Sequence, residues 1–216
     1  KWWSLDQLCA NAVKFGLKAI DLVGPDDLAV LKKYGLTCSM MMPGGGSIPD
    51  GWNRRENHDA IERELRERIP ICAAAGVPNI ITFSGNRRGI SDEEGLENCV
   101  AGLNPIKGFA EQHGVTLCIE LLNSKVNHRD YQADSTAWAG EVVKRVGSPR
   151  VKLLYDIYHM QIMEGDVIRT LRNNIQYIAH IHTGGVPGRH EIGPEQELNY
   201  RPIIEAAVEA GFTGYV

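Results

Sequence analysis

Two carboxylates and one imidazole stand at or near the carboxyl ends of short, mostly apolar runs that are typical of buried strands. They are Glu120, Asp156 and His182, in the runs 117–120, 153–156 and 179–182. An ionisable side chain in the middle of a buried strand is costly, whereas one at a strand end can point into a site. Two oxygen ligands and one nitrogen ligand suit one divalent metal ion, and this set does not choose among Mn²⁺, Mg²⁺, Co²⁺ and Zn²⁺. The alternative is that each residue only caps a helix or lies in a loop.

Two further histidines and one aspartate lie near these positions. His159 follows Asp156 by three residues, which would turn it back toward the same end of the sheet. There it could orient a ligand or bind a substrate oxygen, or be satisfied locally at a helix start. His180 shares a strand face with His182 but lies one layer deeper, so a core histidine is the better interpretation. Asp21, on an earlier strand, either lies beside the ligands or pairs with a neighbouring cation of the barrel.

One recurring unit supplies the elements that would hold these residues. An amphipathic run ends at glycine, and a short, mostly apolar run follows at once. Glycine after a helix takes the left-handed closing conformation, and a buried parallel strand reads as a continuous apolar run. The pattern therefore predicts helices that alternate with parallel strands. The glycines are Gly16, Gly35, Gly76, Gly114, Gly147 and Gly211, and the strand runs are 17–23, 36–41, 77–83, 115–122, 151–157, 176–182 and 212–216.

Helix starts agree with this division of the chain. Ser4 to Gln7 and Ser91 to Glu94 have the spacing of a capping box, in which side chains satisfy free backbone donors at a helix start. The longest helices are expected at about 56–75 and 92–113.

The number of units predicts the fold class. Seven strands can be counted, the last cut short at Val216, and an eighth would fit just before Trp3. We therefore predict an α/β fold, a (β/α)8 TIM barrel in a single domain over residues 1–216, with its first and last strands truncated. The rival is an open doubly wound sheet, but no glycine-rich phosphate loop follows any predicted strand.

Composition disfavours several classes of partner. The net charge of −4 gives no electrostatic reason to expect nucleic acid, and no apolar stretch has the length of a membrane span. The five cysteines are odd in number, lack CxxC spacing and lie mostly in apolar runs, which favours core thiols in a reducing compartment. We therefore expect a cytoplasmic protein, although a leader could precede Lys1.

Several segments together resemble a known family. The chain is similar, from about Ala19 onward, to the hydroxypyruvate isomerase group of the xylose isomerase-like barrel superfamily. The order and spacing of the segments carry this resemblance more specifically than any one motif. The segments are 50–54, 83–87, 119–124, 156–161, 182–191 and 197–200.

The resemblance implies a metal-dependent isomerase or epimerase of a small sugar or keto acid, such as hydroxypyruvate. By the family pattern, Glu120, Asp156 and His182 are the first three metal ligands. His159 is a group beside the ligands or the substrate, and Arg189 contacts substrate oxygens, although it could also be a solvated loop arginine. Relatives commonly pair through their barrel faces, so a homo-oligomer is also implied.

The chain departs from the family pattern at both ends. The fourth ligand of the family is a glutamate that follows the last strand, and the printed sequence stops at Val216. A strand cut in mid-course would leave an unpaired edge, so we expect a longer protein rather than an incomplete site. The family's first strand is barely begun by the residues at 1–3.

The expected chemistry is proton transfer through an enediolate. A hydroxy-carbonyl compound that chelates a cation becomes acidic at carbon, and a carboxylate moves the proton. Glu120 is the catalytic candidate, with a partner beyond Val216. Asn86 follows the predicted strand at 77–83 and is a candidate substrate contact. Trp3 could form an apolar wall for the substrate or be a core residue.

Two alternatives come from other functional classes. An abasic-site endonuclease shares the barrel superfamily, but it would need more histidines at the barrel mouth, where only His58 and His128 are available, and a basic groove. A non-catalytic sugar-binding barrel with an incomplete metal site becomes attractive if the protein truly ends at Val216.

Overall fold

The sheet that carries the three ionisable residues is entirely parallel. In the computed structural model, which describes residues 3–216, six strands pair in chain order, each parallel to the next. Asp21 Oδ2 on the first strand lies 2.8 Å from His180 Nε2 on the sixth strand. The sheet therefore curls until its two edges approach each other. The strands are β1 (Ala19–Val23), β2 (Thr37–Met41), β3 (Asn79–Thr82), β4 (Thr116–Glu120), β5 (Val151–Asp156) and β6 (Ile178–His182).

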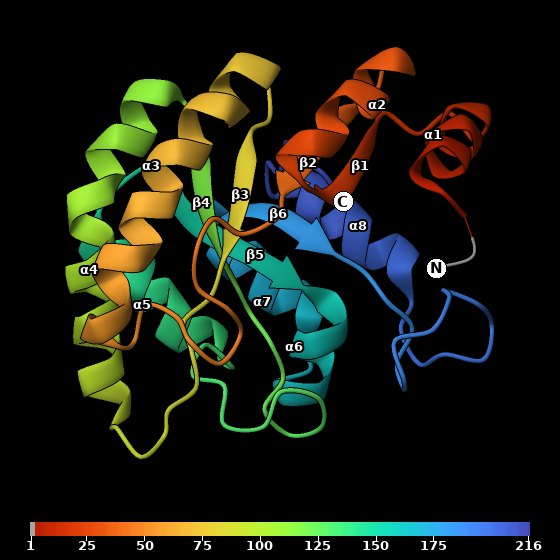
Figure 1. The fold of residues 1–216 in the computed structure, drawn as a ribbon. Coiled ribbons are helices and arrows are strands. Elements are labelled where there is room, and N and C mark those ends of the chain that lie inside the picture. Colours follow the sequence, from red (N-terminus) through yellow and green to blue (C-terminus); the bar gives the residue numbers. More distant parts are fainter. Residues whose placement is uncertain (1–2) are drawn as a thin grey trace.

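Helices cover the outside of this curled sheet. Figure 1 shows α3, α4 and α5 side by side along one part of it, with α1 and α2 next to β1 and β2. Within residues 3–216, no helix is long and apolar enough to cross a bilayer. The helices are α1 (Leu5–Lys14), α2 (Leu28–Lys33), α3 (His58–Ala75), α4 (Asp92–His113), α5 (Thr136–Val146), α6 (Ile157–Met163), α7 (Val167–Asn174) and α8 (Tyr200–Glu209).

Local sequence signals set most helix ends. Ser4 and Gln7 form the predicted capping box at the start of α1. The Ser91 side chain accepts a hydrogen bond from the Glu94 backbone at the start of α4, without the reciprocal bond of a full box. Helices α3, α4 and α5 close on glycines with φ of 70°, 69° and 65°, the left-handed conformation expected at these positions.

The predicted strand at 212–216 is wrong as a full strand. Tyr215 alone forms a parallel bridge with His180, and the Ile181 amide donates to the Tyr215 carbonyl at 3.1 Å. Gly214 lies in a bend, so the chain reaches β6 at one residue only. The six described strands, parallel and curled, confirm the predicted TIM-barrel fold class. The bridge at Tyr215 lies at the β6 edge of this sheet. The predicted strand start at Lys1 and Trp2 lies outside the described residues.

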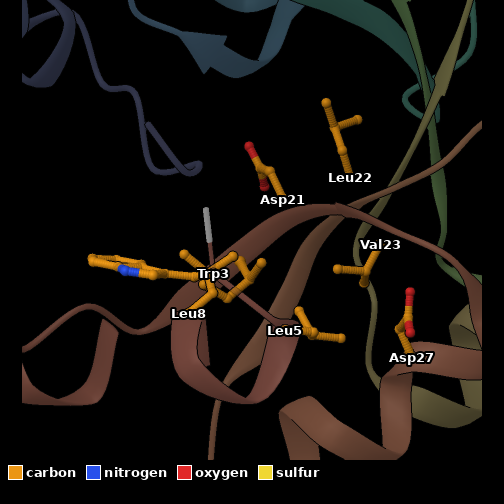
Figure 2. A pocket seen from close by; sticks show the side chains of 8 residues that line it. Trp3, Leu5, Leu8, Asp21, Leu22, Val23 and Asp27 are labelled. Carbon is orange, nitrogen blue, oxygen red and sulfur yellow. The ribbon is translucent and has the colours of Figure 1, made fainter. Parts of the chain in front are cut away.

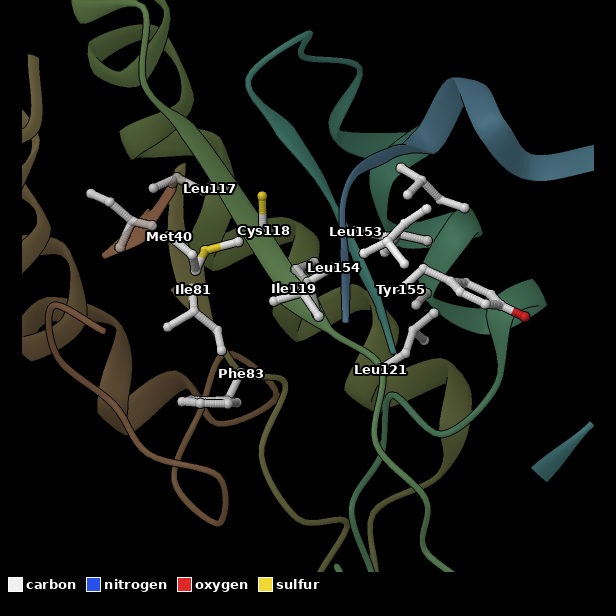
Figure 3. Close-up of a cluster of buried hydrophobic side chains, with 14 of the residues drawn as sticks. Met40, Ile81, Phe83, Leu117, Cys118, Ile119, Leu121, Leu153, Leu154 and Tyr155 are labelled. Carbon is white, nitrogen blue, oxygen red and sulfur yellow. The ribbon is translucent and has the colours of Figure 1, made fainter. Parts of the chain in front are cut away.

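Apolar side chains from the strands fill the interior. Figure 3 shows Met40, Ile119 and Leu153 in one cluster of buried apolar side chains, carried by β2, β4 and β5, and all three are at most 1% exposed. The five cysteines are free and buried, which confirms the prediction that they are core residues.

Close packing of α4 holds the loop between β2 and α3. A Cβ atom added at Gly102 would lie 2.6 Å from the Trp52 ring, which only glycine permits without a shift. The Trp52 indole donates to Thr82 Oγ1 at 2.7 Å. The loop after β2 is therefore fixed against the end of β3, at the same end of the sheet as the three ionisable residues.

Candidate metal and substrate site

The three predicted ligand residues end three neighbouring strands. Glu120 is the last residue of β4, Asp156 of β5 and His182 of β6. Asp156 and His182 are direct partners in the register between their strands. One ligand atom of each residue lies within 4.8 Å of those of the other two. The structure thus brings together three residues from distant segments, and their use as metal ligands stays a prediction.

Asp156 uses its two carboxylate oxygens differently. It is the N-cap of α6, where Oδ1 accepts a hydrogen bond from the His159 backbone at 3.1 Å. Oδ2 lies 3.8 Å from His182 Nδ1. The side chain is fully buried. The helix cap therefore fixes the carboxylate with one oxygen directed at the candidate site.

Glu120 is held through its backbone and faces the imidazole with its side chain. The hydroxyl of fully buried Tyr131 donates to the Glu120 carbonyl at 2.9 Å. Glu120 Oε1 lies 3.4 Å from His182 Nδ1, and the residue is 7% exposed. The carboxylate is thus placed beside His182 at a strand end whose backbone is tied to the loop before α5.

Negative charge surrounds His182. Burial alone would lower the pKa of His182, but contacts with Asp21 and Glu120 and the charges of Glu120 and Asp156 outweigh it and raise the pKa to about 9. Without a cation, the ring is therefore protonated at neutral pH. A cation that binds one ring nitrogen displaces a proton from it.

His159 has the opposite character. Burial lowers the pKa of His159 to about 4, and the nearby charge of Asp156 only partly opposes this. Its Nδ1 accepts from the Asn123 backbone amide at 3.1 Å, so the remaining proton of the neutral ring sits on Nε2. Nε2 lies 3.9 Å from Asp156 Oδ2. His159 therefore presents a neutral donor to the site.

Arg189 reaches the same carboxylate from the loop between β6 and α8. Its Nη1 lies 2.6 Å from Asp156 Oδ2, and its guanidinium stacks over the Tyr158 ring with 5.3 Å to the centroid. The Tyr200 hydroxyl fixes the base of this loop by bonding both the amide and the carbonyl of Gly184. The arginine therefore places a positive charge of the protein itself beside one of the candidate metal ligands.

Asn86 lies in a different network. Its carbonyl accepts from Asn53 Nδ2 at 2.8 Å, and its backbone pairs with Tyr131 in an isolated antiparallel bridge. Within residues 3–216, no hydrogen bond or ion pair joins Asn86 to the three ligand candidates. Asn86 thus joins its loop to the segments that carry Asn53 and Tyr131. A contact between Asn86 and substrate stays a prediction.

Sequence reasoning missed the residues that orient the candidates. Asn123 contacts His159, and Ser39 donates to Asp21 Oδ1, but neither polar residue has a spacing that predicts its partner. His180, interpreted as a core histidine, is fully buried and bonds to Asp21. The position of Asp21 on a predicted strand was the one available signal.

A largely apolar pocket of about 620 Å³ adjoins Asp21. Figure 2 shows Trp3, Leu5 and Val23 around it. Its position beside Asp21 puts it close to His182, whose Nε2 lies 3.3 Å from Asp21 Oδ2. Trp3 lines this pocket, and its contact with substrate stays a prediction.

Comparison with known proteins adds a family to this geometry. The family model described as a xylose isomerase-like TIM barrel matches residues 11–216. A 2-oxo-tetronate isomerase of Haemophilus influenzae is 27% identical over 220 residues, covering 95% of this chain and 83% of that protein. A mouse protein assigned as a hydroxypyruvate isomerase is 25% identical over 162 residues, covering 73% of this chain. The chain spans only 58% of that mouse protein.

A solved structure has the same fold. The structure titled as an AP endonuclease of family 2 from Brucella melitensis superposes with a TM-score of 0.85 at 24% identity, covering 99% of this chain and 86% of that one. At this identity the likeness shows the fold alone.

Proposed function

This chain belongs to the family of xylose isomerase-like TIM barrels, and we propose that it is a metal-dependent isomerase or epimerase of a small hydroxy-carbonyl compound. The substrate class is a keto acid such as hydroxypyruvate, or a keto-sugar. The convergence of Glu120, Asp156 and His182 at one end of the sheet carries this proposal. The isomerase names of its relatives support it.

The three residues fit a divalent cation. They offer two carboxylate oxygens and one imidazole nitrogen, the mixed set that Mn²⁺, Mg²⁺, Co²⁺ and Zn²⁺ accept. His182 Nδ1 is buried and has no hydrogen-bond partner within the described residues. Such an atom is costly unless a ligand satisfies it. When bound, the cation supplies positive charge that stabilises the negative charge developing on neighbouring substrate oxygens.

Glu120 moves the proton. Its carboxylate takes the proton from the carbon next to the carbonyl, and the electron pair of that bond becomes the double bond of an enediolate. Return of the proton to the adjacent carbon, together with transfer of the hydroxyl proton to the former carbonyl oxygen, gives the isomer. Delivery of a proton to the opposite face of the first carbon, by a second acid on that face, gives the epimer. General acid–base catalysis of this kind contributes about 10²- to 10⁴-fold to rate.

The other candidates bind substrate. His159, neutral at pH 7, donates from Nε2 to a substrate oxygen. Arg189 offers two parallel N–H groups to a carboxylate or to paired oxygens, which Lys could not match in geometry. Asn86 is proposed as an additional contact at the rim.

Solvent exchange tests this function. Each of hydroxypyruvate, 2-oxo-tetronate and a ketohexose is incubated in D₂O with Mn²⁺ and protein, and deuterium at carbon is followed by NMR. We expect exchange with at least one substrate, and its loss by at least 10²-fold in Glu120→Gln at saturating Mn²⁺. The control Glu205→Gln changes an exposed carboxylate on α8 that pairs with Arg201. Exchange that persists in Glu120→Gln rejects the role of Glu120, and no exchange with any substrate favours a non-catalytic barrel.

A further inference from the structure

We infer that Asp21 is a positioning residue that holds His182 with its Nδ1 lone pair directed at the metal site. The inference rests on the proposed function, since it assigns how one of the three ligands is oriented. The two ring nitrogens of His182 face opposite ways. Nε2 lies 3.3 Å from Asp21 Oδ2, whereas Nδ1 lies 3.4 Å from Glu120 Oε1. A carboxylate beside Nε2 favours the proton on that nitrogen and leaves Nδ1 free to bind a cation.

Asp21 is itself fixed by buried partners on other strands. The Ser39 hydroxyl on β2 donates to Oδ1, and His180 Nε2 on β6 lies 2.8 Å from Oδ2. Ser39 is 3% exposed and His180 is fully buried. The carboxylate therefore has little freedom to turn away from His182.

The backbone of β1 is strained next to Asp21. Leu22 has φ of 58°, a left-handed conformation that leucine rarely adopts. The register along β2 is irregular on both sides of Asp21, which pairs with Met40, while Val23 pairs with Met41. Leu22 is thus the extra residue of a β-bulge.

The bulge changes where side chains point. Figure 2 shows Asp21 and Leu22 on the same side of the β1 ribbon, whereas consecutive residues of a regular strand alternate. Leu22 is 40% exposed, an unfavourable place for a large apolar side chain. Strain and exposure at Leu22 accompany the turning of Asp21 toward β6, and such strain persists where the surrounding structure requires it.

A second metal ion is the competing explanation. Ligand atoms of Asp21, His180 and His182 also lie within 4.8 Å of one another. However, the Ser39 hydroxyl donates to Oδ1, and Oδ2 lies 2.8 Å from His180 Nε2, the distance of a direct hydrogen bond between these two residues. A second ion would also need both nitrogens of the His182 ring to bind metal. The geometry therefore favours a hydrogen-bonding role for Asp21 at a site for one ion.

The test compares Mn²⁺ binding of the wild-type protein with that of Asp21→Asn by titration calorimetry. We expect one ion per chain in both, bound about 10- to 100-fold more weakly by the variant, as for other partners of metal-binding histidines. The matched control Asp26→Asn changes an exposed carboxylate between β1 and α2, so its affinity should equal that of wild type. Equal affinity in Asp21→Asn overturns the inference while leaving the proposed function intact. Two ions in wild type, with one lost in the variant, overturn it in favour of a second site. A wild-type protein that binds no Mn²⁺ overturns both proposals.

A spectroscopic measurement on the wild-type protein avoids dependence on the folding of a variant. The ¹⁵N shifts of the histidine rings, recorded with Zn²⁺ alone as the bound metal, report which nitrogen carries the proton. We expect His182 to carry it on Nε2, with Nδ1 showing the shift of a metal-bound nitrogen. A proton on Nδ1 would overturn the inference whatever the affinity of the variants.

Discussion

Replacing Arg189 by glutamine should strengthen metal binding and weaken substrate binding. The guanidinium lies 2.6 Å from Asp156 Oδ2 and so competes with a cation for that oxygen. Removing it deletes the competitor without touching a ligand residue. If Arg189 also binds substrate oxygens, the same change removes that contact, so the two affinities should move in opposite directions.

The size of the effect follows from the geometry. Coulomb's law at 2.6 Å gives about 6 kcal/mol at an effective dielectric constant of about 20. The arginine side chain is 39% exposed, and solvent screens much of this energy. A net 1.5–3 kcal/mol, roughly that of a hydrogen bond to a charged group, is a better expectation. Since 1.4 kcal/mol is about tenfold, Mn²⁺ should bind about 10- to 100-fold more tightly.

Titration calorimetry with Mn²⁺ and steady-state kinetics measure the two affinities. The control Arg201→Gln removes an exposed arginine on α8 and should change neither. Arg189→Lys keeps the charge and should bind Mn²⁺ nearly as weakly as wild type. Mn²⁺ affinity that is unchanged or lower in Arg189→Gln would refute the competition between arginine and metal.

Two further predictions concern the scaffold. Gly102→Ala should lower the free energy of unfolding by about 1–3 kcal/mol, because its Cβ would meet the Trp52 ring at 2.6 Å, whereas Gly108→Ala, with no heavy atom within 4 Å, should raise it by up to about 1 kcal/mol. Urea denaturation checks both, and a stabilised Gly102→Ala would contradict the packing. Burial raises the pKa of Cys38 to about 11 and of Cys72 to about 12, against about 8.5 in an unfolded chain. Between these values the unfolded chain loses protons that the folded chain keeps, so stability should fall as pH rises above about 8.5. Mass spectrometry after iodoacetamide at pH 8.5 should find the folded thiols unmodified, and alkylation at the rate of free cysteine would contradict their burial.

Local signals were sufficient for the parts of the fold that depend on a few neighbouring residues. Glycine closes α3, α4 and α5 where the sequence places it, because the left-handed conformation is a property of the residue itself. Apolar runs located β1 to β6, because a parallel strand that is buried on both faces consists mostly of apolar residues. These two signals placed Glu120, Asp156 and His182 at strand ends, and parallel geometry then predicted that they converge.

Orientation within the site could not be predicted in this way. The contact of Asp21 with His182 depends on the curl of the whole sheet and on a bulge at Leu22, a residue type with no preference for a left-handed backbone. The pairing of Arg189 with Asp156 depends on the path of a long loop. The run at 212–216 has the composition of a strand, but a bend at Gly214 allows only Tyr215 to pair.

Metal stoichiometry tests the central claim most directly. Mn²⁺ titration of the wild-type protein should find one ion per chain, with tight binding lost in both Asp156→Asn and His182→Gln while the circular dichroism spectrum is unchanged. A wild-type protein that binds no Mn²⁺, or variants that bind it as tightly as wild type, would contradict the claim that these strand ends form a metal site.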